Sequence, residues 1–376
     1  MVQSETMPSV GHAKRGPAKT GRVNISDVAR LANVSTATVS RVMRDADNVT
    51  ELTRNKVNRA IHMLGYVPNA HARALTMPST TVTVVMNRFS GGAYVRLLEG
   101  IEEEAMASGM SFRLMISGTR PGGLRGTADD LIAQRPAVAI IVAAGNVDEE
   151  QDRVLNERFR QFEDVGTHVV VLGRSRLTLN PGVGVVDYDN ERGMHDVTAR
   201  LIELGHREFL YADRMGRYSH VFDARRAGFL RALGEAGIPH DPRFELQLGE
   251  DRAENVSRLQ AAWESGVRFT ALVASMDDRA LDMIVGLREL GLSVPGDVSV
   301  SGFDDMPYAG DLMVPLTTVH VPFYEMGRAA VRMGVGNDGL DCVEPVRLVE
   351  RASIDVPSMA VPVSAPGPAS GLTPAR

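Results

Sequence analysis

The residues best suited to chemistry lie early in the chain, in the segment ISDVARLANVSTATVSRVM (25–43). Within it, Thr36, Ala37 and Arg41 fall on one face of a predicted helix, since Arg41 follows Ala37 by one turn. Arginine can donate two hydrogen bonds to guanine, threonine can donate, accept or touch the thymine methyl, and alanine adds apolar contact. We predict that this face reads base edges in a DNA major groove. The alternative is an ordinary helix pair in which Arg41 is solvated.

A second set of residues carries hydroxyl or amide groups near predicted helix starts, where phosphate oxygens are readily bound. This set is Thr38, Ser40, Thr50, Thr53 and Asn69. The following stretch, YVPNAHARAL (66–75), predicts a helix too short to be stable alone in water. It would form against a partner copy or against DNA, where Leu75 could wedge into a minor-groove step. The alternative is a plain linker helix.

Three helices must position these groups, and the sequence contains the signals that start and end them. Asn24, Ser35 and Thr50 are favourable N-cap residues. The first helix ends at Asn33, which tolerates the left-handed conformation, and the third ends at Gly65. Apolar residues recur at helical spacing, so the three helices can share a small core. The segment 23–68 is therefore predicted to be an all-α helix-turn-helix unit.

From residue 81 the pattern changes to short apolar runs separated by amphipathic helical stretches. Continuous apolar strands that alternate with helices indicate parallel sheets covered on both faces. The expected strands are Val82–Met86, Phe112–Ile116, Val138–Val142, His168–Leu172, Phe209–Ala212, Ala271–Ala274 and Val298–Phe303. About 275 residues exceed one comfortable sheet, so two doubly wound lobes are expected over 81–355. A ligand would bind in a cleft at the carboxyl ends of the strands.

Charge and composition narrow the function classes. Net charge is −6, but residues 1–78 carry 11 Lys and Arg against 5 Asp and Glu (+6), and the others carry 30 against 42 (−12). Local basic density attracts phosphates, although a chance charged face would give the same asymmetry. One cysteine, no signal segment and no long apolar run favour a cytoplasmic protein without a membrane partner. Residues 1–22 predict a disordered basic arm, and 356–376 a disordered Pro/Ala/Ser tail.

Catalytic and metal-binding motifs are missing from the sequence. There is no GxxxxGK[ST], GxSxG or HExxH motif. The Gly-rich stretch Pro121–Gly126 has no Lys-Ser/Thr after it and predicts a surface loop. Cys342 has no partner for a zinc site, and the nine histidines show no ligand spacing. We therefore expect neither an enzyme nor a bound metal or cofactor.

Several motifs in order then resemble the LacI (LacI/GalR) family of transcriptional regulators over roughly Val23 to Ile354. They are ISDVARLANVSTATVSRVM, YVPNAHARAL, VDYDNERG, LIELGHR, DARRAGFLRALGEAGIP, LRELGLSVPGDVSVSGFDD, PLTTVHVPFYEMGR and RLVERASI. The resemblance implies a homodimer, or a higher assembly, that binds a pseudo-palindromic DNA operator. It implies that Thr36, Ala37 and Arg41 read bases, and that Ala72 and Leu75 of a hinge helix and linker (69–80) enter the minor groove.

The same resemblance implies a periplasmic-binding-protein-like body with a small-molecule effector between its lobes. Arg225 would bind the effector from one lobe and Asp277 from the other, and Tyr94 would form part of the cleft wall. The structural alternatives are a surface arginine and a helix N-cap aspartate. Two departures stand out: Met276 replaces the usual Asn before Asp277, and Gly91–Tyr94 (GGAY) replaces a usual pair of aromatics.

The predicted function is a sequence-specific DNA-binding regulator, expected to act as a repressor, whose operator affinity depends on an effector. A sugar or sugar derivative is expected, because vicinal hydroxyls suit an Arg and Asp pair; a purine would require more stacking aromatics. The rivals are a solute-binding receptor, opposed by the lack of a signal segment, an α/β enzyme, and a non-specific architectural DNA binder. Whether the effector induces or co-represses is left open.

Overall fold

The computed structural model describes residues 23–43, 46, 49–66, 79–87, 92–119, 121–142, 148–176, 178–214, 220–336 and 339–358. The chain divides into two compact units, Met1–Met77 and Pro78–Arg376. We call the first unit the head and the second the body. The predicted arm, nearly all of the predicted hinge helix and linker, and most of the predicted tail lie outside the described residues.

The head is the predicted three-helix unit, with α1 (Ile25–Ala32), α2 (Thr36–Met43) and α3 (Glu51–Leu64). Asn24 accepts hydrogen bonds from the backbone of Ser26 and Asp27, as a good N-cap does. Asn33 adopts a left-handed conformation with φ 53°, which ends α1 and makes the turn. A core of small and branched side chains holds the helices together: Val28, Ala29, Ala32, Val39, Val42, Val57 and Ala60. The predicted caps and turn are thus confirmed.

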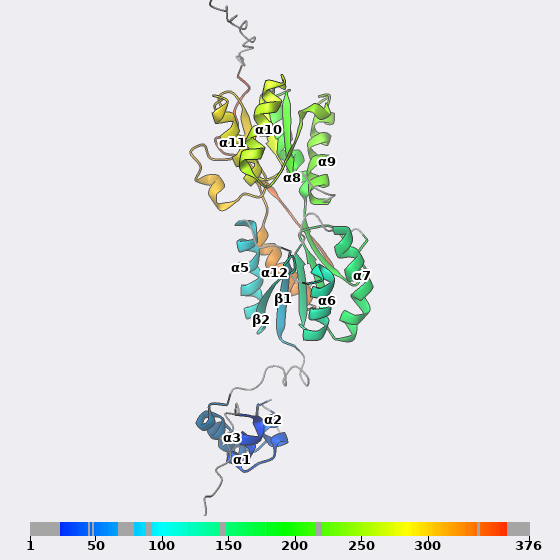
Figure 1. Ribbon diagram of the computed structural model, residues 1–376, viewed down its shortest axis with the longest axis vertical. Helices are drawn as coiled ribbons and strands as arrows, with labels where there is room; N and C mark the ends of the chain where they lie inside the picture. Colours follow the sequence, from blue (N-terminus) through cyan, green and yellow to red (C-terminus); the bar gives the residue numbers. More distant parts are fainter. Residues whose placement is uncertain are drawn as a thin grey trace, which may run out of the picture. The chain divides into compact units, whose positions relative to one another are not determined.

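The body consists of two lobes, and the first, which we call the N-lobe, is built on a six-stranded parallel sheet of order β11-β5-β4-β3-β1-β2. Its strands are β1 (Thr81–Met86), β2 (Ser111–Ile116), β3 (Val138–Val142), β4 (His168–Leu172), β5 (Gly184–Tyr188) and β11 (Asp341–Glu344). Its helices are α5 (Gly92–Ala107), α6 (Gly123–Gln134), α7 (Asp148–Asp164) and α12 (Phe323–Gly334). Helices α5 and α12 cover one face of the sheet, and α6 and α7 cover the other (Figure 1).

The second lobe, which we call the C-lobe, has a four-stranded parallel sheet of order β7-β6-β8-β9. Its strands are β6 (Phe209–Arg214), β7 (Glu245–Leu248), β8 (Ala271–Ala274) and β9 (Ser299–Ser301). Its helices are α8 (Asn190–Glu203), α9 (His220–Glu235), α10 (Arg252–Glu264) and α11 (Asp277–Glu289), with short 3-10 turns η1 (Pro242–Phe244) and η2 (Pro307–Gly310). Helices α8 and α9 cover one face and α10 and α11 the other (Figure 1).

The chain passes between the lobes more than once. It leaves the N-lobe after β5 and enters α8, then returns after β10 (Thr318–His320) into α12. After β11 it runs back to β12 (Arg347–Val349), which pairs antiparallel with β10. The predicted pair of doubly wound parallel lobes is confirmed. The chain crossings determine which strand ends of the two lobes face each other.

Two helix crossings in the body are closer than side chains normally allow. A Cβ atom on Gly228 of α9 would lie 2.1 Å from the carbonyl oxygen of Glu191 on α8. A Cβ atom on Gly327 of α12 would lie 2.3 Å from the carbonyl oxygen of Leu97 on α5. Glycine is therefore required at both crossings, because a larger residue would push the helices apart. These close contacts fix the position of α9 against α8 and of α5 against α12. They therefore also fix where Arg225 on α9 and Tyr94 on α5 lie.

Candidate functional site

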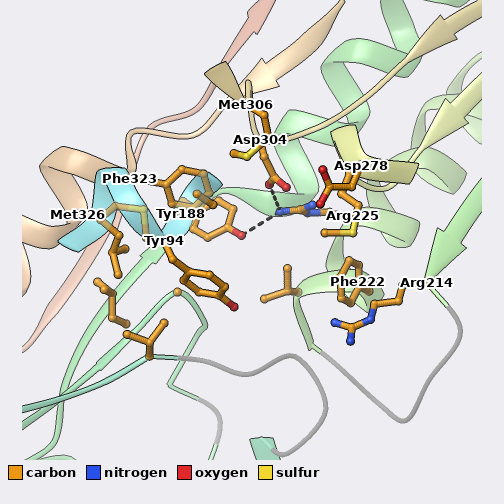
Figure 2. Close-up of a pocket in the computed structure, with 17 residues that line it drawn as sticks. Tyr94, Tyr188, Arg214, Phe222, Arg225, Asp278, Asp304, Met306, Phe323 and Met326 are labelled. Carbon is orange, nitrogen blue, oxygen red and sulfur yellow. Dashed lines mark hydrogen bonds and ion pairs between the residues drawn. The ribbon is translucent and has the colours of Figure 1, made fainter. Parts of the chain in front are cut away.

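A cavity of about 160 Å³ lies between the lobes of the body, at the carboxyl ends of their parallel strands. Tyr188 ends β5, Arg214 ends β6, and Met276 and Asp304 follow β8 and β9. This is where a ligand is expected in doubly wound sheets. Figure 2 shows the side chains of both lobes converging on this cavity, which we call the pocket.

Among the described residues, the N-lobe wall of the pocket is mostly apolar. Its side chains include Tyr94, Leu97, Val142, Leu172, Phe323 and Met326. Tyr188 and Phe323 pack edge to face with ring centroids 6.1 Å apart, which fixes both rings. The predicted cleft-wall position of Tyr94 agrees with this placement, since α5 begins just before it and directs it into the pocket (Figure 2).

Arg225 on α9 lines the C-lobe wall and is only 2% exposed. It donates to the Asn190 side chain (2.9 Å) and to the Ser275 carbonyl oxygen (2.5 Å). Its Nη2 donates to the Tyr188 hydroxyl and to Asp304, both at 2.9 Å. The guanidinium also lies 3.8 Å from the ring centroid of Phe303. Four N–H groups of Arg225 are therefore used in hydrogen bonds within the protein. One of these bonds reaches Tyr188, at the end of β5 in the N-lobe.

Burial and pairing set the protonation states around Arg225. Burial lowers and the Asp304 charge raises the pKa of Arg225, and the net rise keeps the guanidinium charged. Burial raises the pKa of Asp304, and the charge of Arg225 opposes that rise. Burial also raises the pKa of the Tyr188 hydroxyl, so Tyr188 stays neutral. The pair is a buried ion pair with its hydrogen bonds satisfied.

Asp277 does not line the pocket, in contrast to the effector contact predicted for it. Its carboxylate is fully buried and accepts from the Thr318 hydroxyl (2.6 Å) and from the backbone N–H of Met306 (2.7 Å). A Cβ atom on Gly302 would lie 2.2 Å from its Oδ1. Burial raises the pKa of Asp277 well above its usual range. Asp277 thus holds the segment after β9 in place, and the acid at the pocket is its neighbour Asp278.

Four polar groups at the pocket were not predicted from the sequence: Tyr188, Arg214, Asp278 and Asp304. Each lies at or just after the carboxyl end of a strand, which is the one signal in the sequence that could have found them. The prediction instead relied on motif positions. The pocket therefore brings together Tyr94 and Arg225 from the predicted set and leaves out Asp277.

The head presents the predicted base-reading residues on one surface. Thr36, Ala37 and Arg41 are exposed on α2 and Ser40 is half-buried beside them. The Thr38 hydroxyl lies 2.9 Å from the Ser35 hydroxyl at the start of α2. The Thr53 hydroxyl lies 2.9 Å from that of Thr50 at the start of α3. The DNA role of all these residues stays a prediction; Asn69, Ala72 and Leu75 lie outside the described residues.

Over the described parts of the chain, no group of His, Cys, Asp and Glu side chains could hold a metal ion. Over the same parts, no helix is long and apolar enough to cross a membrane. The chemistry that the pocket offers is binding, through apolar surface and a few fixed polar groups.

Two family models match the chain. Residues 24–69 match the model of bacterial regulatory proteins of the lacI family. Residues 198–354 match the model of a periplasmic binding protein-like domain.

Known regulators resemble the chain over most of its length. Catabolite control protein A of Priestia megaterium is 31% identical over 312 residues, which cover 83% of this chain and 91% of that protein. The HTH-type transcriptional repressor PurR of Vibrio parahaemolyticus is 32% identical over 313 residues, covering 81% and 89%.

Solved structures give the same fold. The Lac repressor dimer bound to operator and the anti-inducer ONPF superposes with a TM-score of 0.76 at 26% identity, covering 89% of this chain and 100% of that one. A complex of the transcriptional regulator CelR with cellobiose superposes with a TM-score of 0.64 at 27% identity, covering 88% and 100%.

Proposed function

Because the chain belongs to the LacI family of transcriptional regulators, a family of DNA-binding proteins and not of enzymes, we propose that it binds a specific operator under the control of a small effector. The head would bind DNA as part of a homodimer, with α2 of each copy in one major groove. The pocket between the lobes would hold the effector. Action on chromosomal DNA would require the cytoplasmic location expected from the sequence.

The observation that carries this proposal is the pairing of an exposed polar face on α2 with a pocket built from both lobes of the body. Thr36, Ala37 and Arg41 are the groups on α2 that can reach base edges. Thr38, Ser40, Thr50 and Thr53 are proposed phosphate contacts. Asn69, Ala72 and Leu75 are proposed for the minor groove.

Effector control follows from the position of the pocket. A ligand that contacts both walls binds one arrangement of the lobes better than another, and only such differential affinity can shift an equilibrium. Arg225 of the C-lobe wall donates to Tyr188 of the N-lobe wall, so this hydrogen bond depends on how the two lobes are arranged. A coupling of about 1–3 kcal/mol would change operator affinity about 5–150-fold.

The related proteins differ in their effectors, so they support more than one effector class for this chain. The CelR complex contains cellobiose, which favours the sugar or sugar derivative expected from the sequence. Other relatives are PurR repressors. The sugar expectation also relied on Arg225 and Asp277 acting as a pair, and Asp277 does not line the pocket.

The test begins with selection of sequences by the purified full chain from a random duplex library. We expect enrichment of a palindromic site. Arg41→Ala should weaken binding to that site by about 1–3 kcal/mol, roughly 5–150-fold, because a bidentate contact to a base is lost.

Arg30→Ala is the matched control, since Arg30 is an exposed arginine of the same head, on α1, paired with Asp27. It removes the same charge and should change affinity far less. Equal losses for the two variants would show that only charge matters, and no enriched sequence at all would favour the non-specific architectural binder.

A further inference from the structure

The turn from Phe303 to Met306 follows β9 and lies between the pocket and the strands β10 and β12, which we call the crossing strands. We propose that this turn transmits effector binding from the pocket to the crossing strands, with Asp305 as the positioning residue on which the transmission depends. The inference rests on the proposed role of the pocket as the effector site. It is supported by the different partners of two neighbouring aspartates, by an uncommon backbone conformation, and by one buried residue that holds both ends of the turn.

Asp304 is the residue of the turn that faces the pocket. Its side chain is 10% exposed, lines the pocket and accepts from Nη2 of Arg225 at 2.9 Å (Figure 2). The same Nη2 donates to the Tyr188 hydroxyl of the N-lobe wall. A ligand that bonds to Arg225 or to Asp304 therefore changes the geometry that this ion pair prefers.

Asp305, the next residue, contacts the crossing strands instead. Its Oδ2 lies 2.9 Å from Nδ1 of His320, the last residue of β10. Its Oδ1 accepts from Nη2 of Arg351, just after β12, at 2.7 Å. Arg351 also donates to the carbonyl oxygen of Leu316, just before β10, at 2.8 Å. Because β10 leads into α12 and β12 follows β11, these contacts tie the turn to the two segments that return to the N-lobe.

The contacts of Asp305 are charge-assisted. Burial acts to raise the pKa of Asp305, but the hydrogen bonds from His320 and Arg351 and the charge of Arg351 hold that pKa below its usual range. Asp305 is therefore ionised in the folded protein. Hydrogen bonds to an ionised acceptor are the stronger kind, and water screens them little here, since the side chain of Asp305 is only 13% exposed.

The backbone between the two sets of contacts has an uncommon conformation. Asp304 has a φ of 108° and Asp305 a φ of 54°. Positive φ is uncommon for residues other than glycine; aspartate tolerates the left-handed region that includes the φ of Asp305, but the φ of Asp304 lies beyond it. Such conformations persist only where surrounding contacts over-determine them. Loss of the contacts on one side of the turn therefore lets it relax, and this weakens the contacts on the other side.

Asp277 holds the two ends of the turn. Its backbone N–H donates to the Phe303 carbonyl oxygen at 2.8 Å, and its carboxylate accepts from the Met306 N–H at 2.7 Å. The other oxygen of this carboxylate accepts from the Thr318 hydroxyl of β10. With its ends held, the turn can change mainly at the two residues between them, which are the two that contact the pocket and the crossing strands.

These contacts give effector binding a route to the lobe arrangement. An effector that favours one geometry of Arg225 and Asp304 favours one conformation of the turn, and through Asp305 one position of the crossing strands. Because the crossing strands connect the lobes, the same effector then favours one arrangement of the lobes. Differential affinity of this kind is what shifts a conformational equilibrium.

The first experiment is a double-mutant cycle on the full-length protein, measured by urea unfolding. The fluorescence of Trp263, the single tryptophan, reports on the C-lobe, since Trp263 lies on α10. Arg225→Met breaks the contact with Asp304, and Arg351→Met breaks the contact with Asp305. Because either change lets the turn relax, the double variant should lose at least about fivefold less of its folding equilibrium constant than the product of the two single losses.

Arg226→Met combined with Arg351→Met is the matched control cycle. Arg226 is on the same helix as Arg225 and also pairs with an acid, Glu245, but it does not contact the turn. Its loss and the loss at Arg351 should multiply within about twofold, as expected for independent sites. If the cycle of Arg225 and Arg351 is equally additive, the proposal is overturned.

The second experiment measures affinity for the operator that the chain selects from random duplex. Arg225→Met should change this affinity by at least about fivefold when Asp305 is present, and by less than about twofold in the Asp305→Asn background. Asp241→Asn is the matched control background, because Asp241 also pairs with an arginine, Arg243, but at an exposed site away from the turn. There the change caused by Arg225→Met should remain at least about fivefold.

An effect of Arg225→Met on operator affinity that is equally large with and without Asp305 would overturn the proposal, as would no effect in either background. If Arg225→Met does not give a folded protein, Asp304→Asn replaces it in both experiments, since it removes the charge of the pair and keeps the shape of the side chain. Failure of the chain to select any operator is a separate result. It would reject the proposed function, while the unfolding cycle would still decide whether the turn couples the pocket to the crossing strands.

Discussion

The two walls of the pocket differ in the chemistry of their side chains. The described part of the N-lobe wall is mostly apolar and contributes surface through Leu97, Phe323 and Met326 among others. The C-lobe wall carries the charged groups Arg214, Arg225, Asp278 and Asp304. Most of those charges are already paired within the C-lobe, and Arg225 also braces the two lobes through its hydrogen bond to Tyr188. Charge in a pocket is therefore not the same as charge available to a ligand.

The largest effect should come from breaking that brace. Arg225→Met leaves Asp304 buried without its partner, which typically costs about 3–5 kcal/mol of unfolding free energy. Urea denaturation of the purified chain measures it. Arg226→Met is the control on the same helix, because Arg226 is about two-fifths exposed and pairs with Glu245; it should cost about 1 kcal/mol or less. Similar losses for both would contradict a bracing role.

The apolar wall should respond to lost volume and not to lost charge. Leu97 is 3% exposed, and Leu97→Ala should lower the unfolding free energy by about 2–4 kcal/mol through lost burial and a residual cavity. The loss should be the same at low and high salt, since no charge is involved. Leu98→Ala, at a partly buried neighbouring position, should cost less. A salt-dependent loss at Leu97 would contradict the apolar reading of this wall.

A smaller, pH-dependent effect on the free energy of unfolding is expected at Asp187, the residue before Tyr188. Burial raises the pKa of Asp187 to about 6, and its Oδ1 has no hydrogen-bond partner among the described residues. Because the folded-state pKa lies above the ordinary value of 3.8, the protonated form is favoured by folding. Its stabilising contribution is complete below about pH 4 and is lost as pH rises through about 6.

The Asp187→Asn side chain stays neutral at every pH, so the variant does not lose the stability that the wild type loses when Asp187 ionises. The variant should be more stable than the wild type by about 3 kcal/mol near pH 7.5, and the difference should nearly vanish near pH 3, below both pKa values. Denaturant midpoints at the two pH values measure it. Asp189→Asn is the matched control: Asp189 caps α8 by accepting from the Arg192 N–H, and an asparagine oxygen can accept the same bond, so this variant should change stability little at either pH. Equal stability of Asp187→Asn and wild type at both pH values would reject the buried-acid interpretation.

Local structure in the head could be predicted almost completely from the sequence. The cap at Asn24, the left-handed Asn33 and the terminal Gly65 depend only on neighbouring residues, and each appears as predicted. The strands of the body were also predicted, because continuous apolar runs are a local signal. The adjacent pair Asp277 and Asp278 shows where this reasoning fails. Two identical side chains differ by one position on α11, and only their packing decides that the second reaches the pocket.

The sequence by itself therefore determined the order of elements, the helix boundaries of the head and the family, because these depend on residue types at short spacing. Tertiary structure decided which charges are available. Arg214 and Arg225 are the same residue type and both line the pocket, with side chains 18% and 2% exposed. They differ because residues far apart in the chain, Tyr188, Ser275 and Asp304, converge on Arg225 and leave the Nε of Arg214 without an acceptor among the described residues. Hydrogen-bond saturation is a property of the folded neighbourhood, and it exists only once the lobes have assembled.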